Sequence, residues 1–278
     1  MFGFGQNSSG DSGEMSFLQH LEALRWHLVR SAAVVMILAV LAFFFKDIIF
    51  DGVILAPKHA DFPTYRALCK LGRLLHMEGD FCVQNLNFRL QNIDLSGQFT
   101  THMWISFIAG LLVASPYVFW ELWSFIKPAL RETERRYATG IVFFTTLLFL
   151  MGIAFGYFIL SPFSVNFLAT YQVSTEVENI ITLDSYIYTV TTMTLISGII
   201  FELPIFVYFL TKFGILSPTF MNTYRKHAVV VILIAAAVIT PSSDITTMLL
   251  TAFPLYVLYE VSIVVSWRVV SNQSKDQA

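Results

Sequence analysis

Residues 119–137 read FWELWSFIKPALRETERRY, and this stretch decides the fold because an apolar segment passes here into a dense group of charges. Pro128 marks the turn between the two parts. Basic loops resist transfer across a membrane, so they mark its cytoplasmic side. We therefore expect a membrane helix to end here and the chain to emerge into the cytoplasm. Four basic residues lie within ten positions: Lys127, Arg131, Arg135 and Arg136.

The composition of the whole chain agrees with a membrane location. Of its 278 residues, 56% are hydrophobic and 13% are charged, and the mean hydropathy is +0.66. Such a chain is too apolar for one water-soluble core, which predicts an all-α integral membrane protein. The formal net charge of −2 gives no indication of nucleic acid as a partner.

Apolar segments on both sides of the central loop predict six transmembrane helices. Residues 1–16 are expected to form a flexible polar tail, and residues 17–29 an amphipathic segment at the membrane surface. The fifth helix has only 13 residues, about 20 Å of helix, which is too short to cross a hydrocarbon core upright. The expected helices cover residues 31–50, 103–125, 138–160, 186–210, 228–240 and 248–267.

The distribution of basic residues orients these helices. Segments on the side of the central loop hold 11 of the 17 Lys and Arg residues, and the two later outer loops hold none. The other six lie in the long first outer loop, residues 51–101, and in the few residues just before it. Long loops cross membranes with less regard to their charge. We therefore expect both termini in the cytoplasm and residues 51–101 in the periplasm.

Both cysteines lie in this long loop. Cys69 and Cys82 have 12 residues between them, and an oxidising periplasm would favour a disulfide worth about 2–4 kcal/mol. Two unpaired thiols are the alternative that the sequence leaves open.

Glu202 lies inside an apolar helix, where an acid is by default a candidate functional residue. The alternative is a protonated acid that hydrogen-bonds to backbone groups freed by Pro204. In the third expected helix, three glycines offer close approach of a neighbouring backbone. These are Gly140, Gly152 and Gly156.

Four motifs together resemble the TatC family, the receptor subunit of the twin-arginine protein translocase. They are Leu-Arg at 24–25, SPYVFWELWSFIKPALRETERR at 115–136, FELP at 201–204 and TPSSD at 240–244, before a last helix that contains YE. The resemblance runs from about residue 17 to 267. It implies six helices in a concave, glove-like arrangement, with helices 5 and 6 short, in the bacterial inner membrane.

The resemblance also implies a function that is not enzymatic and needs no cofactor or metal. Folded precursor proteins would cross the membrane independently of the Sec route, driven by the proton-motive force, and no GxxxxGK[ST] nucleotide motif occurs in the chain. The implied partners are twin-arginine signal peptides, single-span proteins of the TatA/TatB type, other copies of the chain and membrane lipid.

Glu134 matches the carboxylate with which the family recognises the two arginines. A carboxylate can accept two hydrogen bonds from the planar guanidinium fork, which Lys cannot offer. The local alternative is an ion pair of Glu134 with a neighbouring arginine. A second family acid would fall at Ala23. Either the neighbouring Glu22 replaces it, or the second acid is missing and Glu132 shares the role. Arg25 and Phe125 are expected to order and pack this site, with Arg136 beside them.

Other positions are expected to serve partner docking or structure. Asp244 is expected to cap helix 6, while Met248 and Glu121 stand where the family often has Gln. Pro57 is expected to shape the first outer loop and Pro128 the central turn.

The sequence offers less support for two other functions. An intramembrane protease would need a GxSG or GxGD motif, and neither occurs in the chain. A proton-coupled transporter of small solutes would use Glu202 and Glu260 as a relay, but no inverted repeat supports it.

Overall fold

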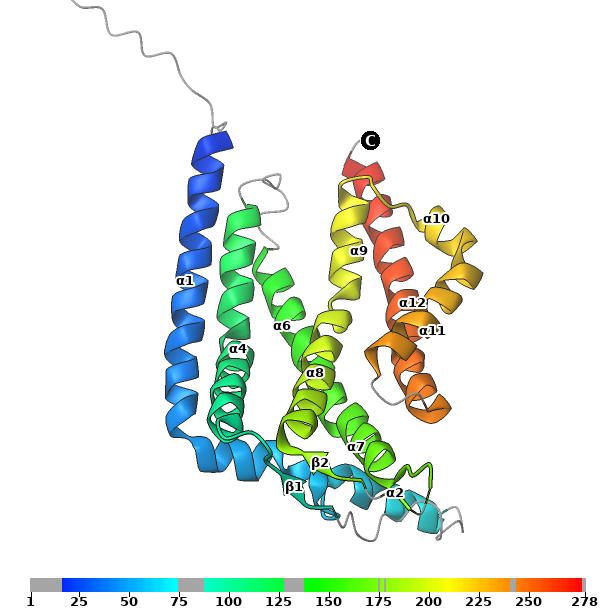
Figure 1. The fold of residues 1–278 in the computed structure, drawn as a ribbon. Helices are drawn as coiled ribbons and strands as arrows, with labels where there is room; N and C mark the ends of the chain where they lie inside the picture. Colours follow the sequence, from blue (N-terminus) through cyan, green and yellow to red (C-terminus); the bar gives the residue numbers. More distant parts are fainter. Residues whose placement is uncertain are drawn as a thin grey trace, which may run out of the picture.

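The computed structural model describes residues 17–74, 88–127, 138–174, 176–177, 179–240 and 244–276. Across these residues the fold is built from helices, which confirms the all-α class (Figure 1). A search of the described part finds five segments that are long and apolar enough to cross a membrane. They are Leu21–Phe44, Gly97–Ile126, Gly140–Thr170, Leu183–Lys212 and Ile245–Asn272.

The expected helix that is missing from these five is the fifth in the chain, α11 (Arg225–Ile239), with 15 residues. Its length of about 22 Å at 1.5 Å per residue is below the ~30 Å of a typical hydrocarbon core. Helix α11 is therefore the short element that the residue count predicted.

Helix α1 (Phe17–Phe44) is one continuous helix. The sequence suggested a surface segment at 17–29 followed by a separate span at 31–50. Residues 17–44 contain no Gly or Pro, so no residue interrupts the helical hydrogen bonding. The span also ends earlier than expected, and the chain turns into η1 (Ile48–Ile54) and η2 (Ala56–Lys58).

The next two spans begin or end beyond their expected limits. Helix α4 (Gly97–Ile126) starts six residues before position 103. Helix α6 (Ala138–Phe155) continues through a π-helical turn, η4 (Gly156–Leu160), into α7 (Ser161–Thr170).

Two of the three glycines singled out in the sequence lie in close contacts. A Cβ on Gly152 would lie 2.6 Å from the Ser197 carbonyl oxygen, and one on Gly156 would lie 2.7 Å from the Met193 carbonyl oxygen. Gly140 has nothing within 4 Å, so it supports no close approach. Spacing alone could not separate these cases, because the contact depends on where the next span, which contains Met193 and Ser197, lies.

Helix α8 (Leu183–Phe201) and α9 (Leu203–Lys212) form one span that is interrupted at Glu202, two residues before Pro204. After α10 (Pro218–Thr223) and α11, the chain ends in α12 (Ile245–Asp276). Helix α12 has 32 residues, so the expectation of a short sixth helix was wrong. No Gly or Pro follows Pro254, and the helix therefore continues past the apolar part.

A layer of short elements covers the end of the helices away from the two termini (Figure 1). It contains η1, η2, α2 (Pro63–Leu74) and a parallel pair of short strands, β1 (Leu90–Gln91) and β2 (Ile181–Thr182). Tyrosine hydroxyls join this layer to the spans. Tyr65 donates to the carbonyl of Pro162 at 2.9 Å, and Tyr186 donates to that of Ile54 at 2.9 Å.

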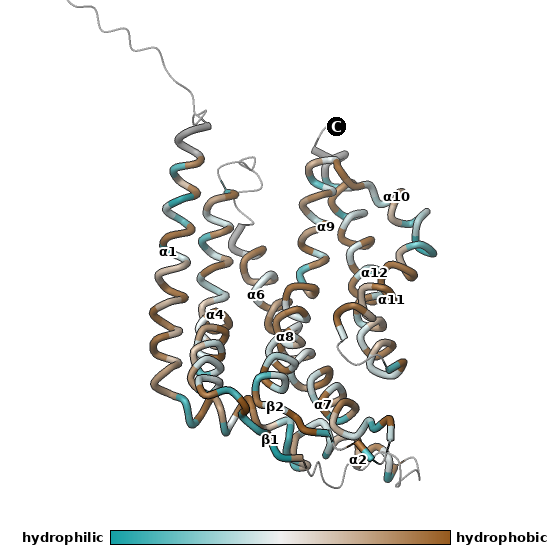
Figure 2. Tube along the Cα trace, viewed as in Figure 1, coloured by the Kyte–Doolittle hydropathy of each residue, from teal (hydrophilic) through white to brown (hydrophobic). Residues whose placement is uncertain are grey.

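The helices form two groups that diverge toward the end where α1 begins and α12 ends (Figure 1). One group is α1 with α4, and the other is α9, α10, α11 and α12, with α6 and α8 between them. Hydrophobic residues cover the middle of the helices, while hydrophilic residues gather at their ends and in the layer of short elements (Figure 2). This arrangement agrees with the concave, six-helix fold that the resemblance implied.

Candidate functional site

A buried carboxylate lies between α1 and α4, near the end at which α1 begins. The side chain of Glu121 is only 2% exposed. Its Oε2 contacts Nδ1 of His27, and its Oε1 accepts a hydrogen bond from the Tyr117 hydroxyl at 2.6 Å. Arg30 adds a positive charge close to the same carboxylate. We call His27, Arg30, Tyr117 and Glu121 the α1–α4 cluster.

The packing of α1 on α4 explains why these side chains meet. Along α1, the less exposed residues recur every three or four positions, and Ala23, His27 and Ser31 lie on this face. On α4, Tyr117 and Glu121 are four residues apart and therefore share one face. The ring of Phe125, one turn further, lies edge-on to the His27 ring at 6.1 Å.

A close backbone contact fixes the register of the two helices. A Cβ on Gly110 would lie 2.5 Å from the backbone nitrogen of Ala39, so α1 and α4 approach here more closely than larger residues allow. Further toward the short elements, the His102 ring stacks on Phe43 with centroids 4.0 Å apart. Both contacts lie in the half of α1 nearer the short elements and hold it against α4 there.

The other residues expected in this site are not all part of the cluster. Glu22 and Arg25 are exposed, and Glu22 lies off the α1 face that packs on α4. Glu134, Arg136 and Pro128 lie outside the described residues, so their contacts stay a prediction.

Glu202 is buried at the junction of α8 and α9 and is 6% exposed. Among the described residues, neither carboxylate oxygen has a hydrogen-bond partner. The carboxyl group lies near the backbone of Phe149 on α6. The hydrogen bonds to freed backbone that the alternative interpretation requires are therefore not formed, and the burial of this acid is left without a structural reason.

Asp244 directly precedes α12, and Met248 lies in the first turn of this helix. The Asp244 carboxylate accepts the backbone N–H of Thr247 at 2.9 Å, as a helix N-cap does. Met248 packs on the apolar cluster of Ala236, Ala252 and Leu255 between α11 and α12.

Glu260 lies further along α12 in an ion pair. Its Oε2 lies 2.7 Å from a guanidinium nitrogen of Arg225, and the Tyr256 hydroxyl donates to Oε1 at 2.9 Å. Within the described part of the chain, no hydrogen-bonded route leads from Glu202 to Glu260, because Glu202 has no partner.

Pro57 and Cys69 belong to the layer of short elements. Pro57 is fully buried, and its carbonyl accepts the Tyr65 hydroxyl at 3.2 Å. Cys69 is disulfide-bonded, and its predicted partner Cys82 lies outside the described residues.

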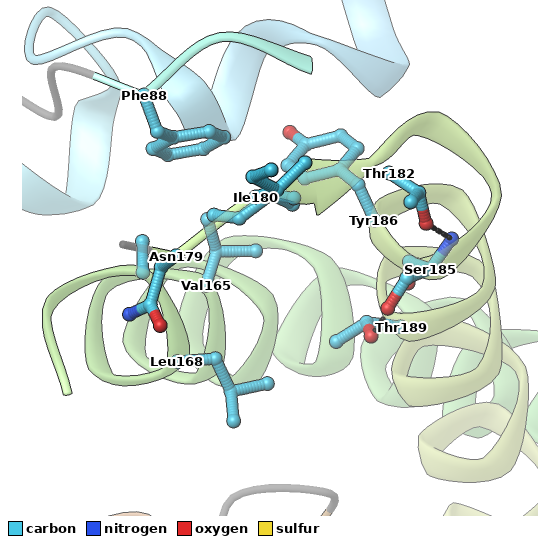
Figure 3. A pocket seen from close by; sticks show the side chains of 11 residues that line it. Phe88, Val165, Leu168, Asn179, Ile180, Thr182, Ser185, Tyr186 and Thr189 are labelled. Atoms are coloured by element: carbon cyan, nitrogen blue, oxygen red, sulfur yellow. Dashed lines mark hydrogen bonds between the residues drawn. The ribbon is translucent and has the colours of Figure 1, made fainter. Parts of the chain in front are cut away.

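A hollow of about 340 Å³ lies beside this layer, between β2, α7 and α8 (Figure 3). Its polar side chains are used within the fold: Asn179 donates to the Tyr171 carbonyl at 2.7 Å, and the Thr182 hydroxyl accepts the Ser185 N–H at 3.3 Å. Val165 and Leu168 supply apolar walls. The hollow therefore presents few spare polar groups for chemistry.

Sequence reasoning missed His27 and Tyr117. The spacing of Tyr117 and Glu121 at four residues was a usable signal for their contact. The contact of His27 with Glu121 spans 94 positions and depends on the packing of two helices, which the local pattern does not contain. Among the described residues, no group of three or more His, Cys, Asp or Glu side chains could hold a metal ion.

Comparisons with known proteins point to one family. The sequence model of the family described as Sec-independent protein translocase protein (TatC) matches residues 19–254. A protein named Sec-independent protein translocase protein TatC from Blattabacterium sp. subsp. Periplaneta americana is 41% identical over 93% of this chain and 97% of its own length. Its namesake from Koribacter versatilis is 34% identical over 92% and 86%.

A solved structure gives the same result for the fold. The crystal structure of a twin arginine translocase receptor, TatC, superposes with a TM-score of 0.67 at 28% identity. It covers 90% of this chain and 99% of the solved one.

Proposed function

The chain belongs to the TatC family of Sec-independent protein translocases, and from this premise we propose that it binds twin-arginine signal peptides of folded precursors. It is a multi-pass protein of the bacterial inner membrane that takes part in protein translocation and is not an enzyme. The observation that carries the proposal is the family match across residues 19–254, which includes both helices of the α1–α4 cluster.

We propose that the signal peptide binds where α1 begins and α4 ends. In this proposal, Glu134 in the loop after α4 accepts the guanidinium group of one arginine, and a bidentate pair explains why Lys is a poor substitute. In the same proposal, Arg25 and Arg136 order the Glu134 carboxylate. Phe125 supports the proposal, because its ring packs against α1 at this end.

Partner proteins complete the proposed translocase. Single-span proteins of the TatA/TatB type would pack on α11 and α12, and further copies of the chain and lipid would surround the other spans. Helix α11 is too short to cross the membrane upright. A longer helix of a partner would fill the part of the hydrocarbon core that α11 does not span. The outward face of α11 and α12 offers large exposed apolar side chains: Val230, Val231, Ile234, Val238, Leu249 and Phe253.

Transport of folded precursors is proposed to draw on the proton-motive force. The alternative of a solute transporter is weaker, because Glu260 already pairs with Arg225 and no described hydrogen bond leads away from Glu202. Uptake of solute by proteoliposomes that contain only this protein would support that alternative.

The decisive experiment measures binding of a signal peptide to the purified full-length protein. A peptide with Arg-Arg is compared with its Lys-Lys variant, for the wild type and for Glu134→Ala. We expect the wild type to prefer Arg-Arg by at least about tenfold and Glu134→Ala to lose this preference. Equal binding of both peptides by the wild type would contradict the proposal.

A further inference from the structure

Two arginines side by side carry two guanidinium groups, and each binds best to its own carboxylate. The helices that flank the proposed site offer few acids. Helix α1 contains a single acid, Glu22, and α4 contains a single acid, Glu121. A second carboxylate supplied by these helices must therefore be one of these two residues.

The positions of the two acids distinguish them. Glu22 is exposed on the side of α1 that turns away from α4. Glu121 lies in the interface of the two helices, directly against His27. The side chain of His27 is 23% exposed, while that of Glu121 is 2% exposed, so the imidazole separates the carboxylate from the outside.

We propose that Glu121 is a second arginine-binding carboxylate of the signal-peptide site, which His27 covers until a guanidinium group takes the place of the imidazole. This inference rests on the proposed function, because it assigns a further residue to the same peptide site. His27 is then a positioning residue that acts through Glu121.

The geometry favours such an exchange. His27 contacts only Oε2 of Glu121, and Tyr117 holds Oε1, so the carboxylate keeps one partner and its orientation when the imidazole leaves. A guanidinium group brings five N–H donors and a permanent charge, whereas the imidazole is charged only when it is protonated.

The surroundings of the imidazole would also suit a guanidinium group. The centroids of the Phe125 and His27 rings lie 6.1 Å apart. A cation in the place of the imidazole would therefore lie close enough to Phe125 for a cation–π interaction. Arg30 is the other cation near the carboxylate. Arg30 repels any further cation that enters this region. The repulsion is offset only for a ligand that pairs directly with the Glu121 carboxylate.

The test assigns each arginine of the peptide to one carboxylate. Four labelled peptides carry Arg-Arg, Lys-Arg, Arg-Lys or Lys-Lys, and their affinities are measured for the wild type, Glu121→Gln, Glu22→Gln and Glu134→Gln in detergent. We expect Glu121→Gln to weaken Arg-Arg binding by about tenfold. In this variant, replacing one of the two peptide arginines with Lys should no longer lower the affinity, while replacing the other should still lower it. Glu176→Gln, an exposed acid between α7 and α8, is the matched control and should bind like the wild type.

His27→Ala tests the covering role without removing the acid. We expect it to strengthen Arg-Arg binding about threefold, because the guanidinium group no longer competes with the imidazole. This variant also keeps the proposal testable if Glu121→Gln does not fold.

The outcomes separate the inference from the proposed function. The inference is wrong if Lys at each of the two positions still lowers the affinity of Glu121→Gln. It is also wrong if this effect of Lys disappears in Glu22→Gln instead. In both cases Glu134 can still bind an arginine. Weaker binding of all four peptides to His27→Ala by one common factor would also overturn it. If the wild type itself does not distinguish Arg-Arg from Lys-Lys, the proposed function fails.

Discussion

Glu121 and Glu202 are the two buried carboxylates among the described residues, and their surroundings differ. Glu121 has His27 and Tyr117 as partners, whereas both oxygens of Glu202 lack one. A buried polar group without a partner costs stability, so it persists in a fold when another constraint retains it. At Glu202 we propose that transport is that constraint, because neither carboxylate oxygen has a hydrogen-bond partner among the described residues.

Glu202→Met tests this trade-off between stability and transport. The variant replaces an unpartnered carboxyl group with an apolar chain of similar size, so we expect the free energy of unfolding to rise by about 1–3 kcal/mol. Translocation of a folded reporter should fall at the same time. Unfolding in detergent and export in cells give the two measurements.

Glu202→Gln is the matched control for this substitution. It keeps two polar atoms in the same place and should therefore bring little gain in stability. A loss of stability in Glu202→Met would show that the carboxyl group holds the fold together.

At the residue scale, the sequence identified the acids but not their partners. Glu202 was recognisable because an acid within an apolar run is rare and needs only local information. Glu121 was expected to serve partner docking, since its position in the resembling family often holds Gln. Its contact with His27 is set by the register of α1 on α4, which the close approach of Gly110 and Ala39 fixes, and no local pattern encodes that register.

Elements were predicted well in their centres and poorly at their ends. Long apolar runs gave the spans, because a membrane requires backbone hydrogen bonds to be made within a helix. The ends depend on breakers and caps, and α1 and α12 both continue through polar sequence that contains none. The layer of short elements could not be predicted in detail, since its tyrosines bind carbonyls from distant segments.

Packing between α6 and α8 depends on Gly152. A Cβ there would meet the Ser197 carbonyl oxygen at 2.6 Å and Gly198 Cα at 2.8 Å, and backbone atoms cannot move aside cheaply. We expect Gly152→Ala to lower the free energy of unfolding by about 1–3 kcal/mol. Chemical denaturation in micelles measures it.

Gly140→Ala is the control on the same helix. Its new methyl group has nothing within 4 Å, so the higher helix propensity of Ala should leave stability unchanged or raise it by up to about 1 kcal/mol. Equal losses for both glycines would contradict the packing role of Gly152.

The start of α12 depends on Asp244. Its carboxylate accepts the Thr247 N–H, and removal of a capping side chain costs about 0.5–2 kcal/mol. We therefore expect Asp244→Ala to lower the thermal stability, and Asp244→Asn to recover most of it because an amide oxygen can still accept the bond. An effect of Asp244→Asn as large as that of Asp244→Ala would point to the charge rather than the cap.

The layer of short elements holds the spans together at the scale of the whole molecule. Tyr65 is its most connected member, because its hydroxyl donates to Pro57 in η2 and lies 2.9 Å from the Pro162 carbonyl in α7. We expect Tyr65→Phe to lower the free energy of unfolding by about 1–3 kcal/mol, since the Pro57 and Pro162 carbonyls lose the one hydroxyl donor that they share.

The pH dependence of the free energy of unfolding tests the role of Tyr65 in a second way. Burial raises the pKa of the Tyr65 phenol above its ordinary value of 10.0, so the folded state keeps the proton when the unfolded state releases it. Its contribution to stability is therefore complete below pH 10.0 and is lost as the pH rises above that value. The fall in stability between neutral and alkaline pH should be shallower in Tyr65→Phe, and an identical slope would contradict this assignment.

The orientation of the whole molecule follows from charge. The connection between α7 and α8 contains no Lys or Arg, while Lys212 at the end of α9 and Arg225 and Lys226 at the start of α11 lie at the opposite end of the spans. Basic segments stay in the cytoplasm, so we expect Glu176→Cys, in a background without native cysteines, to react with an impermeant maleimide added to intact cells. Lys226→Cys should react only after the membrane is opened, and a fluorescent protein fused after Ala278 should fluoresce. Labelling in the reverse order would place the α1–α4 cluster on the periplasmic side. Signal peptides of folded precursors do not arrive on that side, so both proposals for the site would then fail together.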